Sequence, residues 1–575
     1  MDGNEIATTA SSGSNRAVQI DQLSIASIEN VEVFKAPIPS MSANAIGGAV
    51  NFNTKSAFDQ KGRRAFAQVG VNMDSNDFSF SKSPGPGHGE SAERRIYPVG
   101  RLEYSNSFFR NRLGMVFSAG HDYTNQLASS VTHNLNVTAL PGTTLPAAPT
   151  LYTQDNVAIR RGAMSFAPNR QLRVRSDVSL NTDYRLTESI ALYLKTTVSL
   201  YKSTNRNHGF TLTPGTLAAG ATAKDYTTTG GTAAQSVSIF DKNTNSWQIN
   251  PGLKYRAGDW KVDLVGGFSK STNHYKNPDT FTSLNTTLGA VGWTMSTPLD
   301  NDTPSSIAQT SGPDFYNLNH YTSSQGNLAS TAGQPRANHN GLVANNHRDS
   351  WDAKYSSRLD VQRDFAGASF PFYVKAGLAS NEQIRAKRQD QKRWYWMGQD
   401  GVPTADDLTA AGAQLGRFAE PTPVTQNIPG WSLREPAYFS AYELYRFWQA
   451  NPQVLQENTA YTAQQKIAGR QKVNEQISAA YVMANGKFNR LNVLAGVRVE
   501  KTEIRVEGYR VLPVTGAASV LPAGVDANSL AGVLAAYRSF VTRSDYRADP
   551  FPYLHLKYEW LPGLQLRASY TEAIG

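Results

Sequence analysis

Aromatic and basic side chains gather in and beside one segment of the chain, residues 387–470, which holds four of the nine tryptophans. Aromatic rings can stack on sugar faces or on catecholates, and neighbouring cations suit anionic groups. We therefore expect ligand contacts from Arg385, Arg388, Trp394, Tyr395, Trp396 and Trp431. The alternative is a loop that packs on itself as a lid, with residues 438–448 as a small amphipathic helix.

No catalytic motif accompanies this segment. The sequence contains no GxxxxGK[ST] phosphate loop, no HExxH pair and no nucleophile elbow, so we expect neither an enzyme nor a cofactor. The absence of cysteine excludes disulfides and thiolate metal sites. His320, His339 and His347 share one long connection and could in principle bind a metal, but solvated loop histidines are the favoured interpretation and no metal site is predicted.

The composition narrows the class of protein. Of 575 residues, 40% are hydrophobic and 18% charged, below the roughly 25% charged residues of soluble domains. With a mean hydropathy of -0.44 and no apolar run near the ~18 residues of a spanning helix, a helical membrane protein is excluded. The net charge of +10 is scattered in short doublets, which argues against a nucleic-acid partner. A soluble β protein and a transmembrane β-barrel remain.

Alternation with a period of two residues dominates the chain after residue 60. In one example, Leu554, Leu556 and Tyr558 share one face of a strand while His555 and Lys557 share the other. The pattern predicts an all-β chain with about 13 strands. They lie near 64–73, 97–108, 111–123, 170–183, 188–203, 244–256, 259–275, 350–364, 371–386, 471–485, 489–506, 544–559 and 563–573.

The connections between these strands alternate between short and long. The long ones are predicted at 74–96, 124–169, 204–243, 276–349, 387–470 and 507–543. Outer-membrane barrels have short periplasmic turns and long extracellular loops, whereas a soluble sandwich has no reason to place every long loop at one end. Aromatic residues near the strand ends, such as Trp247, Trp260 and Trp351, also suit an interfacial girdle. The pattern therefore favours a transmembrane antiparallel β-barrel.

A motif near the N-terminus stands outside this pattern. Residues 17–30 read as a short helix-like or mixed segment, 31–35 read Val-Glu-Val-Phe-Lys, and 45–55 read Ala-Ile-Gly-Gly-Ala-Val-Asn-Phe-Asn-Thr-Lys. This resembles the end of the plug domain of TonB-dependent outer-membrane receptors, just before the first barrel strand. Ala36 departs from the usual glycine of the Lys-Gly-Pro turn. The matching residues are Val31, Glu32, Val33, Lys35, Pro37, Asn44, Ile46, Gly47, Gly48 and Asn51.

The resemblance implies that residues 1–60 are the C-terminal part of a plug and that 61–575 belong to a 22-stranded barrel, incomplete at its C-terminus. In that family, small residues such as Gly47 and Gly48 let the plug chain pass close to the barrel wall. Since no leader, energy-coupling box or C-terminal signature strand is recognisable, we expect a chain cut from a longer one.

The function that the resemblance implies is TonB-coupled active uptake of a scarce solute, such as an iron chelate or a glycan. The implied location is the outer membrane of a Gram-negative-type bacterium. The implied partners are a TonB-type energy-coupling complex, outer-membrane lipid and a small-molecule or oligosaccharide ligand, with the chain as a monomer. The alternatives are a passive outer-membrane porin or adhesin without energy coupling, and a secreted carbohydrate-binding or carbohydrate-degrading β protein.

Overall fold

The chain is described by a computed structural model. The described residues are 2–9, 27–45, 47–56, 58, 62–74, 80, 83–84, 92–93, 95–139, 157–277, 280–299, 302–323, 341–365, 370–402, 404, 406–424, 432–547 and 549–574. Side chains are not described at 83–84, 92–93, 138–139 and 157–160.

Strands make up most of the described chain, and four short α-helices lie late in it. The strands are β1 (Ile28–Phe34), β2 (Ala49–Thr54), β3 (Arg64–Met73), β4 (Ser83–Pro84), β5 (Ala92–Glu93), β6 (Ile96–Phe108), β7 (Leu113–Leu127), β8 (Ser130–Ala139), β9 (Val157–Ala167), β10 (Asn169–Arg185), β11 (Ile190–Thr213), β12 (Thr216–Leu217), β13 (Tyr226–Ala257), β14 (Trp260–Tyr275), β15 (Ser283–Ser296), β16 (Ser306–Ser311), β17 (Thr322–Ser323), β18 (Val343–Phe365), β19 (Phe372–Trp396), β20 (Leu455–Glu457), β21 (Gln471–Phe488), β22 (Leu491–Val511), β23 (Tyr537–Arg547), β24 (Phe551–Leu561) and β25 (Leu564–Thr571). The helices are α1 (Ala410–Ala413), α2 (Ala441–Ala450), α3 (Thr459–Ala468) and α4 (Leu530–Ala536), with 3₁₀ turns at Leu318–His320, Asp406–Leu408, Leu415–Phe418 and Pro452–Val454.

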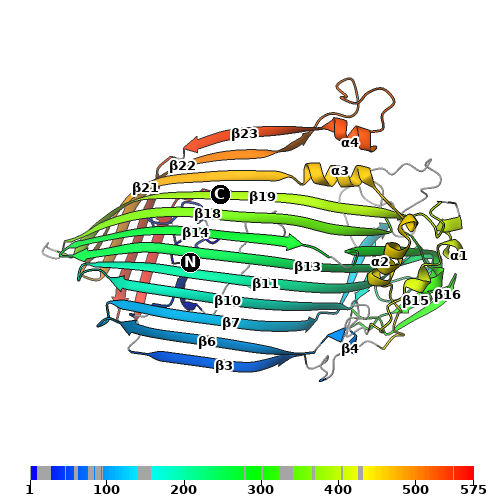
Figure 1. The fold of residues 1–575 in the computed structure, drawn as a ribbon, viewed down its shortest axis with the longest axis horizontal. Helices are drawn as coiled ribbons and strands as arrows, with labels where there is room; N and C mark the ends of the chain where they lie inside the picture. The colour runs from blue at the N-terminus through cyan, green and yellow to red at the C-terminus, as the bar shows by residue number, and fades with distance from the viewer. Residues whose placement is uncertain are drawn as a thin grey trace.

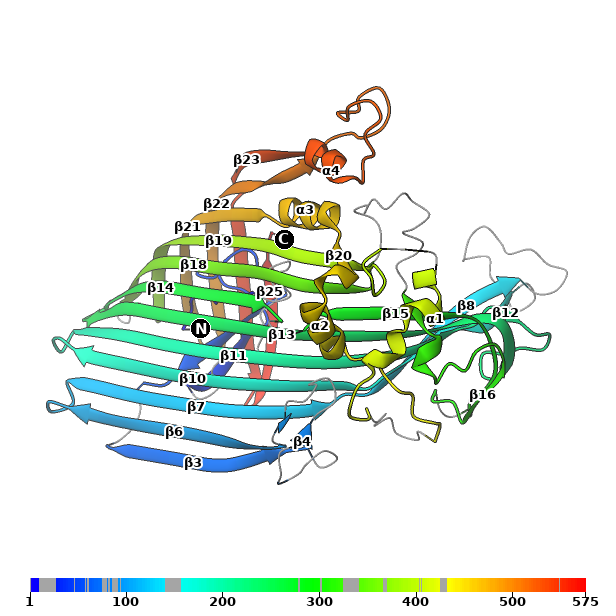
Figure 2. The same cartoon turned by 45° about the vertical axis from the view of Figure 1, so that its right-hand side comes forward.

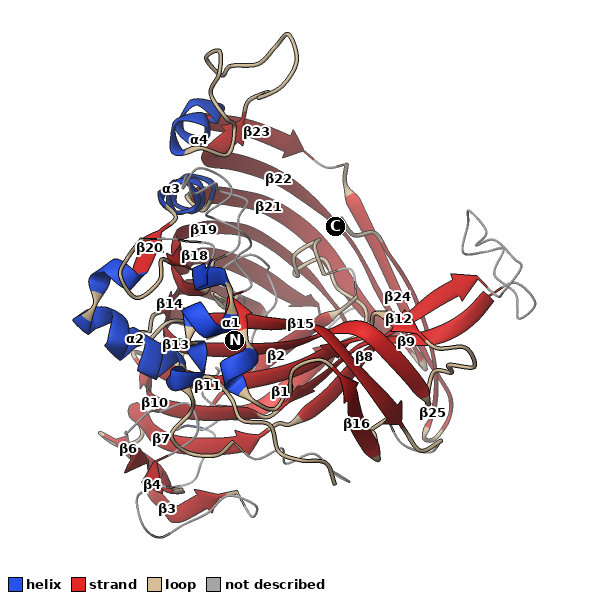
Figure 3. Cartoon of the chain, turned by 90° about the vertical axis from the view of Figure 1, so that its right-hand side faces the viewer, coloured by secondary structure: helices blue, strands red, loops and turns tan. Residues whose placement is uncertain are grey.

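One antiparallel ladder forms the barrel wall. It runs β3–β6–β7–β10–β11–β13–β14–β18–β19–β21–β22, then to β23 and β24, which pair with successive parts of β22, and then to β25. Counting β23 and β24 as one strand, these described residues contain the predicted 13. The wall curves around β1 and β2, which pair with each other in a separate two-stranded sheet (Figure 3).

The two ends of the wall differ, as the loop lengths predict. Tight turns close one end, where Gly258 and Gly563 adopt φ of 55° and 86°, values that glycine reaches without strain. The four helices gather at the other end, hereafter the outer end (Figure 1). The predicted amphipathic helix at 438–448 is confirmed there as α2. None of the helices in the described ranges is long and apolar enough to span a membrane.

Several expectations about the long connections were wrong. β11 and β13 continue through much of the predicted loop 204–243, β15 and β16 lie within 276–349, and β19 extends to Trp396 inside the predicted loop 387–470. The strands β8 and β9 likewise occupy part of 124–169 and reach away from the wall (Figure 2). Residues 28–30 of the predicted helix-like segment are in β1, and residues 17–26 lie outside the described chain.

A buried core explains these extensions. Above the wall, the long hairpins and the α1–α2 region pack on one another around side chains such as Phe166, Phe210 and Trp293, each 0–1% exposed. Tyr321 is buried in the same core, where its hydroxyl donates a hydrogen bond to the Phe315 carbonyl oxygen at 2.8 Å. Burial raises the pKa of Tyr321, so this hydroxyl remains a neutral donor. Strands that are covered on both faces lose the apolar–polar alternation by which they could be recognised.

In the wall below this core, the distribution of apolar and polar side chains is the reverse of that in a soluble protein. On β10, the apolar side chains of Val178 and Leu180 are 48% and 38% exposed, whereas Asp177, Ser179 and Asn181 are at most 7% exposed. Leu378 on β19 is 60% exposed. A polar inner face and an apolar outer face are what a wall between lipid and a wet lumen requires.

We predict that lysine at position 378 penalises insertion into lipid. Leu378→Lys would put a charge within the apolar outer face, at a cost of about 2 kcal/mol. Val511→Lys is the control, because Val511 is also 60% exposed but ends β22 beyond that face. Denaturant titration of folding into phospholipid vesicles measures both variants. Equal stability of the two variants would contradict a lipid-facing outer surface.

Candidate functional site

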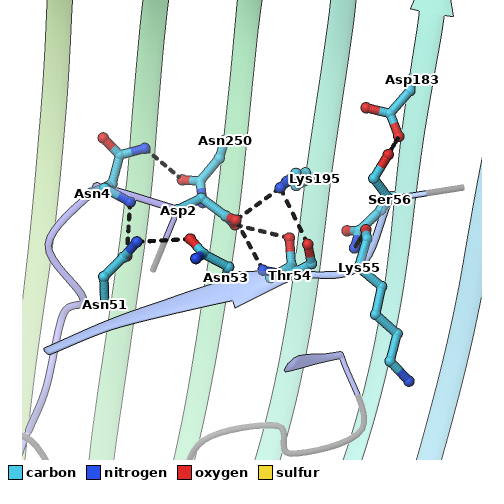
Figure 4. A network of polar contacts seen from close by, with 12 residues as sticks. Asp2, Asn4, Asn51, Asn53, Thr54, Lys55, Ser56, Asp183, Lys195 and Asn250 are labelled. Atoms are coloured by element: carbon cyan, nitrogen blue, oxygen red, sulfur yellow. Dashed lines mark hydrogen bonds and ion pairs between the residues drawn. The ribbon is translucent and has the colours of Figure 1, made fainter. Parts of the chain in front are cut away.

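Two stretches of chain, residues 2–9 and the described part of 27–56 (27–45 and 47–56), lie against the inner face of the wall and are called the inner segments below. Figure 4 shows both stretches beside β10, β11 and β13. Most of their contacts with the wall are hydrogen bonds and ion pairs, because strand alternation turns polar side chains inward. Two apolar contacts are added at the turn between β1 and β2, where Ala43 packs on Phe551 and Tyr553 and Ile38 packs on the cluster of Tyr481, Met483 and Leu494.

Residues 4–9 follow β14, β18 and β19 in an extended course. The Ala7 amide donates to Ser269 Oγ at 3.0 Å, and the Thr8 amide donates to Asp352 Oδ2 at 2.9 Å. Arg385 Nη2 donates to the Thr8 carbonyl at 3.0 Å, and Asn273 Nδ2 donates to the Thr9 carbonyl at 3.0 Å. Main-chain groups of this stretch are therefore satisfied by side chains of the wall, as a sheet edge would satisfy them.

Asp2 joins the two inner segments to the wall. Its carboxylate lies 2.8 Å from Lys195 Nζ on β11 and accepts hydrogen bonds from the Thr54 amide and hydroxyl at 3.0 and 2.9 Å (Figure 4). The side chains of Lys195 and Asp2 are 17% and 7% exposed, so this ion pair is largely shielded from solvent.

The end of the inner segments makes a further set of polar contacts with the wall. Ser56 Oγ donates to Asp183 Oδ2 at 2.9 Å, Lys55 pairs with Glu103, and Asn181 Nδ2 donates to the Lys55 carbonyl at 2.9 Å. Residues 2 and 54–56 are thus held on β6, β10 and β11.

The turn between β1 and β2 is held on the opposite part of the wall, at β22 and β24. Arg498 Nη1 donates to the Pro39 carbonyl at 3.2 Å, and the Ala43 amide donates to Glu500 Oε1 at 3.1 Å. Arg498 and Glu500 are themselves paired at 2.6 Å, and both side chains are at most 5% exposed. This buried pair presents one donor and one acceptor to the inner segment.

The glycines that permit close approach differ from those expected. A Cβ on Gly48 would meet the Phe34 carbonyl oxygen of β1 at 2.3 Å, and a Cβ on Gly47 would meet nothing within 4 Å. Neither glycine therefore brings the chain close to the wall. Wall glycines do so instead, because a Cβ on Gly267 would lie 2.8 Å from Asn4, and one on Gly496 would lie 2.7 Å from Pro39.

The other motif residues lie on the two-stranded sheet and its turn. Val31, Glu32 and Val33 are exposed on β1, and Asn51 Nδ2 on β2 donates to Glu32 Oε2 at 3.2 Å. Lys35 and Asn44 are exposed, Pro37 is buried with its carbonyl accepting from His555, and Ile46 lies outside the described residues.

The predicted ligand contacts separate into three groups. Arg385 faces inward and binds residue 8 of the inner segment, so it acts at the wall contact rather than in an outer loop. Arg388 lies three residues further along β19, on the opposite, outward face. Trp431 lies outside the described chain.

The three aromatic residues 394–396 are packed inside the outer-end core. Trp394 is 7% exposed and contacts Phe281 and Trp448, whereas Tyr395 and Trp396 are 0% and 1% exposed. The Tyr395 hydroxyl accepts from Asn458 at 2.8 Å. These rings have no free face for a ligand in this conformation, in agreement with the alternative of a loop packed on itself.

An inward-facing polar cavity of about 560 Å³ lies near these residues. Its lining includes Asn346 on β18, Gln391 and Arg393 on β19, and Tyr461 on α3. The Arg393 guanidinium stacks over the Tyr461 ring at 3.9 Å from its centre, and the Tyr461 hydroxyl donates to Gln391 at 3.2 Å. The arrangement offers amides, one cation and one aromatic edge to a polar solute. The two-residue alternation of β19 could have predicted that Arg393 faces inward. Tyr461 lies in the helix α3, and its position beside Arg393 follows only from the folded structure.

No metal centre forms within the described ranges, where groups of three or more His, Asp or Glu side chains close enough to hold an ion are absent. His320 contacts the Asp314 carbonyl at 2.9 Å, and His347 accepts from the Asn277 amide at 3.3 Å. His339 lies outside the described residues.

Comparison with known proteins identifies one family model. Residues 273–575 match the model described as TonB dependent receptor-like, beta-barrel. A comparison with curated proteins gives no match.

Solved structures give weak likenesses only. The hemophore receptor HasR of Serratia marcescens, in complex with its hemophore HasA and heme, is 8% identical over 95% of this chain and 69% of that chain, with a TM-score of 0.20. BauA, the ferric preacinetobactin receptor of Acinetobacter baumannii, is 8% identical over 93% and 81%, with a TM-score of 0.25. FauA, the alcaligin receptor of Bordetella pertussis, is 10% identical over 95% and 80%, with a TM-score of 0.15. Such likenesses carry no argument about the ligand.

We predict that Lys195→Met loosens the inner segments. The change removes the partner of Asp2, and a hydrogen bond to a charged group is worth about 1.5 kcal/mol, so exchange of the Thr54 amide should accelerate roughly tenfold. Lys254→Met is the matched control, because Lys254 also faces the lumen and lies near Tyr193, whereas the ion pair with Asp2 is made by Lys195. Hydrogen–deuterium exchange measures both. Equal protection of Thr54 in the two variants would exclude Lys195 as its anchor.

Proposed function

The chain belongs to the TonB-dependent receptor β-barrel family, and on that premise we propose that it is an outer-membrane receptor for TonB-coupled active uptake of a scarce solute. The solute classes that suit this proposal are iron chelates and glycans. In this proposal residues 1–60 are the C-terminal part of the plug and residues 61–575 belong to the barrel. The partners are a TonB-type complex, the surrounding lipid and the solute, and the receptor acts as a monomer.

The observation that carries the proposal is the polar contact between the inner segments and the wall. Ala7, Thr8 and Thr9 are held by individual hydrogen bonds, including those with Ser269, Asp352 and Asn273. Each neutral bond of this kind contributes only about 0.5–1.5 kcal/mol net, and the bond to the Asp352 carboxylate about 1.5–3 kcal/mol, because water replaces the bond when it breaks. Hydrogen bonds along an extended segment can also break one after another rather than together.

An apolar contact would behave differently. Separating apolar surfaces exposes them to water at about 25 cal/mol per Å², with no compensating bond to solvent. A plug that must leave a solute path open while staying inside the wall is therefore better held by hydratable contacts. The wall supplies them, since Lys195, Asp352 and Arg498 remain in a wet lumen when the inner segments move.

The solute contacts that we propose lie on the inner side of the outer end. Gln391, Arg393 and Tyr461 line a cavity large enough for a small polar solute. An arginine that stacks on a tyrosine ring suits carboxylate, catecholate or hydroxyl groups. Arg388 is not included, because it faces outward.

We predict uptake that depends on the proton-motive force. Cells that carry the whole gene should accumulate a radiolabelled ferric chelate or oligosaccharide against its gradient, and a protonophore should reduce the initial rate at least tenfold. The control is the same strain without the gene. Accumulation that only equilibrates with the medium and ignores the protonophore would indicate a passive porin, and surface binding without uptake would indicate an adhesin.

A further inference from the structure

A charged cluster covers the outward side of the wall at the outer end. Cross-strand pairs place His274 of β14 opposite Asp349 of β18, and Asp349 opposite Arg388 of β19. One step further out, Lys276 follows β14, His347 precedes Asp349 by two residues, and Asp390 follows Arg388 by two.

The direction of these side chains follows from their neighbours. Asp352 binds the inner segment and therefore faces inward. Since strand side chains alternate, Asp349 and its partners face outward. Their exposure agrees, because the side chains of His274, Asp349 and Asp390 are 43%, 51% and 51% exposed.

The helix α3 completes the cluster. It continues the line of β21 and lies along the edge of β19 (Figure 1), so that it contacts both faces of that strand. Tyr461 reaches Gln391 on the inner side, whereas Lys466 lies 3.2 Å from Asp390 on the outer side. Arg470 follows α3 and joins the same surface.

Apart from His274, the residues named above on the outward side line a cavity of about 620 Å³. The remaining lining residues are Tyr275, Arg348 and Gln389, which are the alternate residues of the same three strands.

The charges of the cavity are unbalanced. Both acids are engaged, Asp349 with His274 Nδ1 at 2.7 Å and Asp390 with Lys466 at 3.2 Å. Lys276, Arg388 and Arg470 have no carboxylate within 4 Å in the described part of the chain. Arg348 likewise has none there, but its guanidinium stacks over the Tyr275 ring at 4.1 Å and is not counted with these three. Three cations around one cavity form a site for a multiply charged anion, since guanidinium groups bind phosphate oxygens in pairs.

The position of the cavity relative to the bilayer indicates which anion it would bind. Between the row of Val361 and the row of Trp351, the outward side chains of β14, β18 and β19 are mostly apolar. The exceptions are Ser357, Ser380 and Glu382 near the middle, and Lys270 and Thr272 above them. Ten residues of a strand tilted at about 40° rise about 25 Å, which is the height of the apolar band of such barrels. The cavity lies one row above Trp351, at the level of lipid headgroups.

We propose that this cavity binds the phosphate of an anionic lipid in the outer leaflet. The inference rests on the proposed outer-membrane location, but not on transport. A lipid occupant satisfies both parts of the surface, because its phosphate meets Arg388 and Arg470 while its chains lie on the apolar side chains below. An anion free in solution would contact only the cations of the cavity and not the apolar side chains below them.

The test compares two double variants. One removes two positive charges at the cavity, and the other removes two positive charges elsewhere on the outward face of the wall. Arg388→Gln/Arg470→Gln removes two cations without a carboxylate partner. Lys501→Gln/Arg505→Gln is the control, because both side chains face outward on β22 but are paired with Glu503 and Glu507 at 2.6 and 2.9 Å. Native mass spectrometry of the whole receptor in detergent, titrated with phosphatidic acid, phosphatidylcholine or inorganic phosphate, measures binding.

We expect phosphatidic acid to bind the wild-type receptor at least tenfold more tightly than phosphatidylcholine, and the cavity variant to lose at least tenfold while the control stays within twofold. Thermal unfolding in detergent verifies that both variants are folded. Equal loss in the two variants would overturn the proposal, since it would reflect overall charge alone. Inorganic phosphate binding as tightly as phosphatidic acid would also overturn it, by indicating a free-anion site. Because no transport is measured, neither result bears on energy coupling.

Discussion

The wall is one layer of strands with different surroundings on its two faces, and this constraint governs the rest of the structure. Within lipid every main-chain amide and carbonyl must be paired inside the protein, so the strands pair continuously from β3 onward. Each strand then turns alternate side chains to opposite faces. Leu378 and Val178 are exposed for the same reason that Asp352 and Asn181 are buried.

The polar inner face determines how anything inside the wall can be held. The inner segments are fastened by Lys195, Asp352, Arg385 and the Arg498–Glu500 pair, and these groups can be solvated when their partners leave. Close contact depends on wall glycines, since Gly267 and Gly496 leave room for Asn4 and Pro39. Above the bilayer the constraint changes, because hairpins that meet one another bury apolar side chains as in an ordinary core.

The sequence predicted the part of the fold that a two-residue period can encode. The 13 wall strands and the direction of the long connections are confirmed, since one lipid-facing stripe per strand leaves a readable pattern. The outer end was less predictable: β13 has 32 residues and β19 reaches Trp396, where both faces are covered and the alternation fades. The prediction of the ligand-contact residues was limited in the same way, because burial on both faces cannot be read from the sequence pattern. Side-chain type suggested Trp394 and Trp396 as contacts, but only their packing against Trp448 of α2 and against Phe418 shows that they are buried.

The central claim is that uptake requires the inner segments to move relative to the wall. The chain contains no cysteine, so a tether between Ala7→Cys and Ser269→Cys, at positions joined by a 3.0 Å hydrogen bond, would be the sole thiol pair in the described chain. A tether across the wall alone, at Asn485→Cys and Asn492→Cys, is the control. The account predicts that the first tether abolishes uptake while surface binding of the solute persists, that reductant restores uptake, and that the control has no effect. Undiminished uptake with the first tether fully formed would contradict it.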